Sequence, residues 1–168
     1  HAKKESVVIQ KELTEFKLNN DYNCWVSDRA QSEYRKVPIS SISKPAERPL
    51  VIEAGKNVIA LGEAKLVDFA RMKFLAGENK NSLVAELQGE ARVSLPYTTP
   101  WRTIMVGKSP GELLENNYFF ENLNDPCAIK DVAWIKPGKI IREVTLTTQG
   151  GKACVDFAAE NGLQYVEF

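Results

Sequence analysis

The stretch Pro49-Leu-Val-Ile-Glu-Ala-Gly-Lys-Asn-Val-Ile-Ala-Leu61 carries the clearest structural signal in this sequence. Two short runs rich in Val, Ile and Leu flank Ala54-Gly-Lys56, a connection of the length that joins two antiparallel strands. Valine and isoleucine favour extended backbone because their branched side chains pack well on a pleated surface. The stretch therefore predicts a β-hairpin.

Further strands are predicted on both sides of this hairpin. Their sequences combine short apolar runs with Gly, Asn and Asp breaks, and apolar and basic residues alternate in one of them, Ala70–Phe74. The others are Ser6–Ile9, Glu15–Leu18, Leu83–Leu87 and Ala91–Leu95. Antiparallel strands repeated at this spacing predict part of a β-sandwich over residues 1–107.

Residues 28–49 interrupt the strand pattern. They are rich in Ser, Arg and Lys and contain Pro38, Pro45 and Pro49, which remove backbone donors from any regular ladder. A long loop is predicted here. It is either a solvated connection or the border of a site, and the solvated connection is the favoured interpretation.

Residues 108–138 are predicted to form a helical and extended arm. Ser109-Pro-Gly-Glu112 is a capping box with proline at the first helical position, and it predicts a short helix that stops near Asn116-Asn117. Asn124-Asp-Pro126 and Lys136-Pro-Gly138 then predict turns.

Residues 139–168 have the pattern of a β-α-β unit. A strand is predicted over Ile140–Val144, a helix over Lys152–Glu160 with Gly162 as its cap, and a second strand over Leu163–Phe168. Such a crossover makes two parallel strands, and parallel sheets are covered on both faces. Because little sequence remains to cover them, the chain is expected to be a piece of a larger protein.

Length and composition exclude several classes of protein. The 168 residues suit one ordinary domain, and 22 basic against 22 acidic side chains leave no net charge to attract nucleic acid or anionic lipid. No apolar run is long enough for a membrane span. The widely spaced Cys24, Cys127 and Cys154 make no metal cluster, although one disulfide with one free thiol is compatible with the sequence. His1, the single histidine, is expected to have no function.

Two ordered segments resemble glycoside hydrolase family 97. They run from Leu95-Pro-Tyr-Thr-Thr-Pro-Trp-Arg-Thr-Ile to Asn116, and from Leu123-Asn-Asp-Pro-Cys-Ala-Ile-Lys to Lys139; Asp156–Phe168 is also similar to the family, and Tyr22–Trp25 more weakly. The resemblance implies the end of an N-terminal β-sandwich, a linker arm, and the first β-α-β unit of a catalytic (β/α)8 barrel, so the expected fold class is mainly β.

The resemblance also implies an activity. Members are bacterial, periplasmic or secreted, exo-acting α-glucosidases or α-galactosidases that hold calcium in the active site. Their catalytic carboxylates come from later barrel strands, so this chain alone is expected to be inactive. Its expected partners are an oligosaccharide substrate and the remainder of its own enzyme chain, with no nucleic acid or membrane.

One metal ligand is suggested by the resemblance. Leu61-Gly-Glu-Ala-Lys-Leu-Val-Asp-Phe69 is similar to the sandwich motif from which a glutamate reaches the calcium of the barrel, and this would be Glu63. Calcium takes six to eight oxygen ligands, roughly, commonly from distant segments. The alternative is that Glu63 is a strand residue facing water. A structural role is expected for Asp68.

Substrate contacts are suggested at Arg142 and Glu143, where the sequence departs from the tryptophan-rich run of the family. Neighbouring strand residues face opposite ways, so at most one can reach a sugar, and an internal ion pair is equally compatible. Trp25, Trp101 and Trp134 are interpreted as core residues.

A second function of a different class is compatible with this sequence. A sandwich without the catalytic carboxylates can be an autonomous carbohydrate-binding or interaction module with no chemistry of its own.

Overall fold

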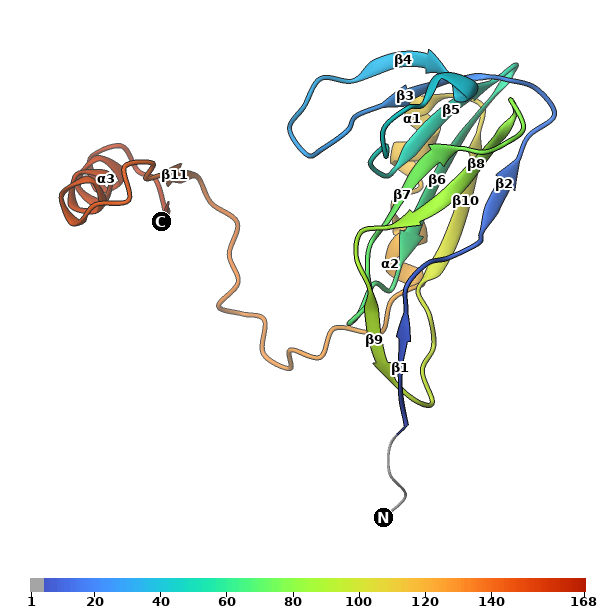
Figure 1. Cartoon of the computed structure of the whole chain (residues 1–168). Helices are drawn as coiled ribbons and strands as arrows, with labels where there is room; N and C mark the ends of the chain where they lie inside the picture. The colour runs from blue at the N-terminus through green and yellow to red at the C-terminus, as the bar shows by residue number, and fades with distance from the viewer. Residues whose placement is uncertain (1–4) are drawn as a thin grey trace. The chain divides into compact units, whose positions relative to one another are not determined.

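The computed structural model describes residues 5–168, so His1 lies outside the described residues. The chain forms two compact units: the first ends at Asp125 and the second begins at Pro126. The first unit extends past residue 107, the predicted end of the sandwich, because the helix that begins at Pro110 packs against the last strand. Figure 1 shows both units along the chain.

The first unit contains two main antiparallel sheets. The five-stranded sheet has the order β10-β6-β5-β3-β4, and the three-stranded sheet has the order β2-β8-β7. The larger sheet is made of β3 (Asn23–Val26), β4 (Arg35–Pro38), β5 (Leu50–Ala54), β6 (Asn57–Ala64) and β10 (Trp101–Gly107), and the smaller one of β2 (Glu15–Lys17), β7 (Met72–Ala76) and β8 (Ser82–Leu87).

The predicted hairpin is confirmed as β5 and β6, with Val51 opposite Ala60 and Ile52 opposite Ile59. Gly55 in its turn has φ +68°, a left-handed conformation that glycine adopts without a steric penalty. The alternation of side chains along these strands sends one set of apolar residues to the core.

The core lies between the two sheets. Its fully buried side chains are Cys24, Leu50, Ile52 and Leu61 from the larger sheet, Met72, Phe74 and Leu83 from the smaller one, and Ile39. Burying one such side chain contributes about 1.5–3 kcal/mol. The predicted mainly β class with an antiparallel sandwich is therefore confirmed.

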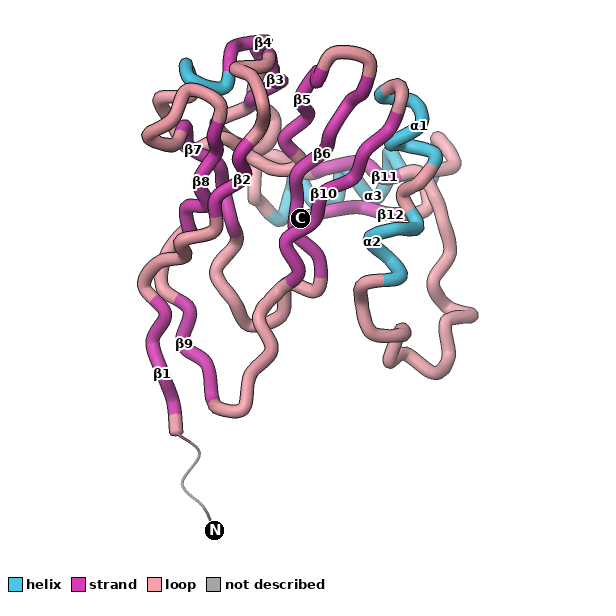
Figure 2. Tube along the Cα trace, turned by 90° about the vertical axis from the view of Figure 1, so that its right-hand side faces the viewer, coloured by secondary structure: helices cyan, strands magenta, loops and turns pink. Residues whose placement is uncertain are grey.

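A two-stranded ribbon, β1 (Ser6–Ile9) with β9 (Ala91–Ser94), continues from this sandwich. In Figure 2 the ribbon extends past the end of the strands β2 and β8. Ser6 pairs with Ser94 and Ile9 with Ala91, so the register is antiparallel.

The predicted long loop contains regular structure. β4 ends at Pro38, and a 3-10 helix, η1 (Ile39–Ser41), follows it and places Ile39 in the core. Proline is accepted because β4 is an edge strand of its sheet, where a missing amide costs little. The interpretation of residues 28–49 as an irregular loop was therefore wrong for residues 35–41.

Two short helices complete the first unit: α1 (Pro110–Glu115) and α2 (Tyr118–Asn122). The capping box is confirmed, because Ser109 Oγ accepts a hydrogen bond from the Glu112 amide at 3.2 Å. The Glu112 carboxylate accepts a hydrogen bond from the Lys108 amide at 2.6 Å, one residue before Ser109, whose amide is the usual donor in a capping box. The Phe120 ring of α2 lies over Gly62 of β6, 3.5 Å from where a Cβ would be.

The second unit contains the predicted β-α-β unit. β11 (Ile140–Arg142) and β12 (Tyr165–Glu167) are parallel, with Ile141 opposite Val166, and α3 (Thr148–Glu160) connects them. The helix begins four residues before the predicted start because Thr147 Oγ1 accepts from the Gly150 amide at 3.0 Å. Gly162, at φ +66°, ends the helix as predicted.

The three tryptophans are exposed, which corrects their interpretation as core residues. Trp25, Trp101 and Trp134 keep 39, 53 and 70% of their surface accessible. Trp25 lies on the outer face of β3, because the flanking Cys24 and Val26 face the core. Trp134 lies outside the helices and strands, in the part of the second unit that precedes Ile140.

None of the helices in residues 5–168 is long and apolar enough to cross a membrane. All three cysteines, which lie within this range, are free thiols, so the compatible disulfide does not form in the structure.

Candidate functional site

Glu63 lies on β6 with its side chain only 3% exposed. Its carboxylate accepts hydrogen bonds from the Met72 amide of β7, with oxygen–nitrogen distances of 3.2 and 3.1 Å. Arg102 lies opposite Glu63 in the β6–β10 register, and its Nη1 is 2.7 Å from Glu63 Oε2. Arg48 forms a second ion pair through its Nε with Glu63 Oε1. The predicted alternative of a water-facing strand residue is therefore wrong.

The ion pairs continue from Arg102 to Glu12. Arg102 Nε donates to Glu12 Oε1 at 2.7 Å, and Nη2 donates to Glu12 Oε2, so the contact is bidentate. Burial disfavours charged Arg102, but the hydrogen bond and charge of Glu12, followed by Glu63, outweigh it and raise the pKa of Arg102. Burial raises the pKa of Glu12, but hydrogen bonds, chiefly the one from Arg102, lower it more. The pKa of Glu12 therefore lies below its ordinary value. Both groups are charged at neutral pH.

A second set of ion pairs connects Arg48, through Glu47, to β7. Arg48 Nη1 is 3.2 Å from Glu47 Oε2, and Glu47 Oε1 is 2.9 Å from Lys73 Nζ and 3.2 Å from Arg71 Nη2. Lys73 also donates to the Asp28 carbonyl at 2.7 Å. The Lys73 side chain is 8% exposed, so its charge is buried with a carboxylate and a carbonyl as partners.

This arrangement does not fit a calcium site. Calcium needs six to eight oxygens, roughly, with few competing cations. The two oxygens of Glu63 are already held by two guanidinium groups and a backbone amide. Within the described residues, no three His, Cys, Asp or Glu side chains lie close enough together to hold a metal ion.

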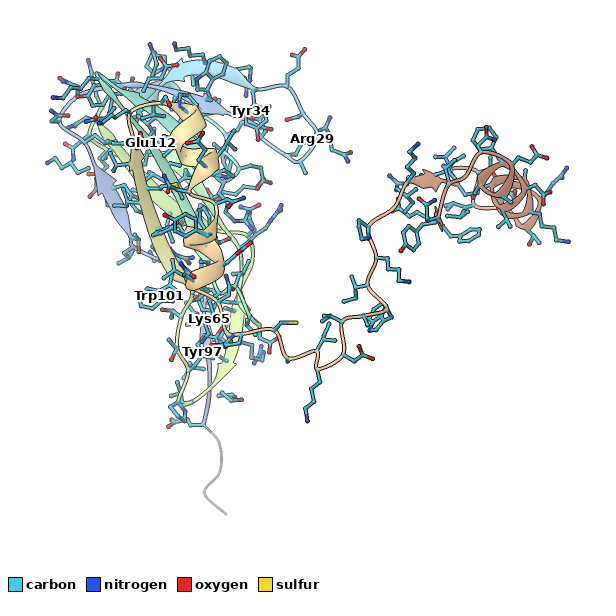
Figure 3. All side chains as sticks on the ribbon, turned by 180° about the vertical axis from the view of Figure 1, so that it is seen from behind. Arg29, Tyr34, Lys65, Tyr97, Trp101 and Glu112 are labelled. Atoms are coloured by element: carbon cyan, nitrogen blue, oxygen red, sulfur yellow. The ribbon has the colours of Figure 1, made fainter. Side chains whose placement is uncertain are left out.

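Asp68 and Lys65 lie in the connection between β6 and β7. Both have positive φ, 48° for Asp68 and 53° for Lys65, a conformation that aspartate tolerates better than most residues. The Lys65 amide donates to Asn124 Oδ1 at 3.1 Å, and Lys65 Nζ is 2.8 Å from Asp125. In Figure 3 Lys65, Tyr97 and Trp101 gather at the end of the first unit where α2 ends.

Arg142 and Glu143 have different surroundings in the second unit. Arg142 is exposed, whereas Glu143 is 3% exposed. The Glu143 carboxylate accepts from the amides of Thr145 and Leu146, both at 2.6 Å, and from the Thr145 hydroxyl. The hydrogen bond from Thr145, followed by the backbone amides, lowers the pKa of Glu143. Glu143 thus stabilises the turn after β11.

A cavity of about 660 Å³ adjoins this turn in the second unit. Glu143 is on its border and Arg142 is not, so only one of the two predicted substrate-binding residues reaches this cavity. The other lining residues include Leu146, Thr147, Gly151, Val155 and Phe168. The oxygens of Glu143 are engaged by its own turn, and the predicted sugar contact stays a prediction.

The ion-pair network around Glu63 was not predicted from the sequence. The sequence did indicate that Glu63 is buried. Ile59, Leu61 and Glu63 are every second residue of β6, so Glu63 lies on the same core-facing side as Leu61. A buried carboxylate at such a position requires a partner. The partners could not be named, because Arg102 and Arg48 are distant in sequence from Glu63.

Comparison with known proteins places the chain in a family. Residues 1–126 match the family model described as glycosyl-hydrolase 97 N-terminal. The chain belongs to glycoside hydrolase family 97. The resemblance predicted from Leu95–Asn116 and Leu123–Lys139 is thereby confirmed.

Relatives of this family are glycoside hydrolases. A retaining alpha-galactosidase of Bacteroides thetaiotaomicron is 26% identical over 187 aligned residues, which cover 88% of this chain and 28% of the relative. A family 97 enzyme from Pseudoalteromonas sp. strain K8, solved in complex with acarbose, is 28% identical, with a TM-score of 0.80 over 99% of this chain and 30% of that one. A variant of that enzyme in complex with panose gives the same values. This family 97 chain thus spans less than a third of these relatives.

A beta-arabinopyranosidase shares the fold alone. Its TM-score is 0.74 at 16% sequence identity, and the match covers 99% of this chain and 32% of that one.

Proposed function

We propose that the chain is the N-terminal part of a bacterial α-glycoside hydrolase of the α-galactosidase or α-glucosidase type. The match of residues 1–126 to the family 97 N-terminal model carries this proposal. The retaining alpha-galactosidase relative supports an α-galactoside as substrate, and the acarbose and panose complexes of the Pseudoalteromonas enzyme support an α-linked oligosaccharide.

The chemistry needs two carboxyl groups that flank the glycosidic bond, one as acid and one as nucleophile or base. The family resemblance assigns them to barrel strands later than β11 and β12. The complete enzyme is accordingly proposed to contain a (β/α)8 barrel that begins with the β-α-β unit, and to be inactive when reduced to these 168 residues. Periplasmic or secreted location and a calcium requirement belong to the same proposal, with the calcium ligands contributed by residues other than Glu63.

The experiment compares the natural full-length protein with the 168-residue chain on nitrophenyl α-galactoside and α-glucoside, each with calcium and with EGTA. The full-length protein is expected to release nitrophenol, more slowly in EGTA, and the shorter chain to release none. Turnover by the shorter chain, or none by the full-length protein on either substrate, contradicts the proposal.

A second candidate function is carbohydrate binding by the first unit itself. Trp25 and Tyr34, 39 and 61% exposed, line a hollow of about 500 Å³ together with Val51, Glu53 and Pro110. Trp25 Nε1 donates to Glu53 at 3.0 Å, and Lys36 Nζ is 2.6 Å from Glu53. An aromatic face bordered by donors and acceptors of both charges suits the apolar face and the hydroxyls of a pyranose ring.

Affinity electrophoresis in gels containing an α-glucan tests this candidate. Retardation of the wild type that Trp25→Ala abolishes and Trp134→Ala preserves supports it, because Trp134 is an exposed indole outside the hollow. Equal retardation of wild type and Trp25→Ala, or no retardation of the wild type, rejects it.

A further inference from the structure

The ion pairs of Glu63 join strands that belong to different sheets. Glu63 and Arg102 lie on β6 and β10 of the larger sheet, whereas the Met72 amide belongs to β7 of the smaller sheet. Lys73, also on β7, pairs with Glu47, which follows the core residue Ala46. At this end of the sandwich the two sheets are therefore held together by charged groups, whereas apolar packing holds them elsewhere.

Glu63 is the least exposed member of this network. Its side chain is 3% exposed, against 13% for Arg102, 20% for Arg48 and 11% for Glu47. A buried charge destabilises the fold unless oppositely charged partners surround it. Removing one partner therefore leaves the remaining charges buried without an opposite charge. Loss of Glu63 would leave two guanidinium groups short of a carboxylate and the Met72 amide without its acceptor.

The same contacts fix the connection between β6 and β7. Glu63 lies two residues before Lys65, which has a left-handed conformation. The Glu63 carboxylate accepts a hydrogen bond from the amide of Met72, at the other end of this connection. Between them, the Phe69 ring stacks on Tyr97 with ring centres 5.9 Å apart. The carboxylate thus links both ends of the connection, and a cation that recruited it would have to displace two arginines and this amide.

We propose that Glu63 is the hub of an ionic clamp that joins the two sheets and fixes the β6–β7 connection, and that it is not a calcium ligand. The clamp consists of Glu12, Arg102, Glu63, Arg48, Glu47 and Lys73. Its role is structural and does not depend on the activity of the complete enzyme.

Thermal unfolding of the natural full-length protein and of the 168-residue chain, each in excess calcium and in excess EGTA, tests the proposal with a matched pair of variants. Glu63→Gln removes the hub charge, and Glu53→Gln makes the same chemical change at the exposed pair with Lys36, where both side chains are about two-fifths exposed. We expect Glu63→Gln to lower Tm by roughly 10 °C or more, equally in calcium and in EGTA, because a buried pair is broken. Glu53→Gln should change Tm little.

Two results overturn the proposal. One is a Tm for Glu63→Gln no lower than that of Glu53→Gln. The other is a calcium-dependent rise in wild-type Tm that Glu63→Gln abolishes. If Glu63→Gln yields no folded protein, Arg102→Lys answers the same question, since it keeps the charge but cannot bridge Glu12 and Glu63 with one planar group. A clear drop in its Tm supports the clamp, and a wild-type Tm contradicts it.

Discussion

The pair between Glu12 and Arg102 gives the sandwich a contribution to stability that depends on pH. Burial opposes the charge of Glu12, but hydrogen bonds led by that from Arg102 leave its pKa below the ordinary value. As pH falls toward the folded-state pKa, the unfolded chain takes up a proton that the folded chain does not, and stability is lost. Above the ordinary pKa of the carboxyl the contribution is complete.

Glu12→Gln is therefore expected to be less stable than the wild type by about 2 kcal/mol at neutral pH, the scale of a hydrogen bond to a charged group. Urea unfolding at neutral pH and near pH 4, roughly the ordinary pKa of a glutamate, measures this difference. The difference should shrink at the acidic value. A constant difference would show that the charge of Glu12 contributes nothing.

The three thiols are predicted to differ in reactivity. Burial, and to a smaller extent the charge of Asp21, raises the pKa of Cys24 to about 12, and its Sγ donates to the Val37 carbonyl at 3.4 Å. The thiolate is the reactive form, so Cys24 should not react while the chain is folded. Cys127 is exposed.

Titration with Ellman's reagent at neutral pH checks this expectation. Cys127 should account for the fast phase, which Cys127→Ser removes, and Cys24 should react only in denaturant. A fast phase lost in Cys24→Ser would contradict the burial of this thiol.

At the level of elements, the cap of α1 is a test of local sequence signals. Ser109 Oγ accepts from the Glu112 amide, and the Leu113 side chain lies over Gly107 of β10, within 3.1 Å of where a Cβ would be. Ser109→Ala is expected to lower the free energy of unfolding by about 1 kcal/mol. Ser109→Thr, which keeps the hydroxyl, should lower it less, and urea unfolding measures both. Equal losses in the two variants would show that the hydroxyl is not what matters.

Elements set by local patterns were predictable from the sequence. The β5–β6 hairpin and the capping box of α1 follow from residues within a few positions of one another, and the β-α-β crossover follows from three successive local patterns. All are confirmed. β4 was missed because Pro38 argues against a strand unless the strand lies at an edge, and only the tertiary fold shows that it does.

The surroundings of the candidate residues were less predictable. The partners of Glu63 depend on the β6–β10 register and on the approach of β7, which no local pattern reports. Glu143 is held inward by the amides of Thr145 and Leu146 in the turn after β11, a contact that the strand predicted through Val144 did not include. Trp25 faces outward because the core side of β3 is taken by Cys24 and Val26, a choice that the short run Asn23–Val26 leaves ambiguous.

At the level of the whole molecule, the division into two units predicts where the chain is cut by proteases. Residues 124–140 are all exposed, and among them only Ile140 belongs to a helix or strand. Proteases cleave most readily where exposed backbone can adapt to the active site without unfolding a core. Trypsin is therefore expected to cut first after Lys130, because Lys136 is followed by Pro137 and the Lys139 carbonyl accepts hydrogen bonds from the amides of Gln164 and Tyr165.

The product ending at Lys130 contains every element from β1 to α2, together with the core and the ionic clamp. It is expected to resist further digestion and to melt in one cooperative transition. Mass spectrometry of a digestion time course gives the cleavage order, and Lys130→Gln is the matched control that should remove the first cut. Early cleavage after Lys36 or Lys73, which lie in strands β4 and β7, would mean that the sandwich is not a stable unit in this chain.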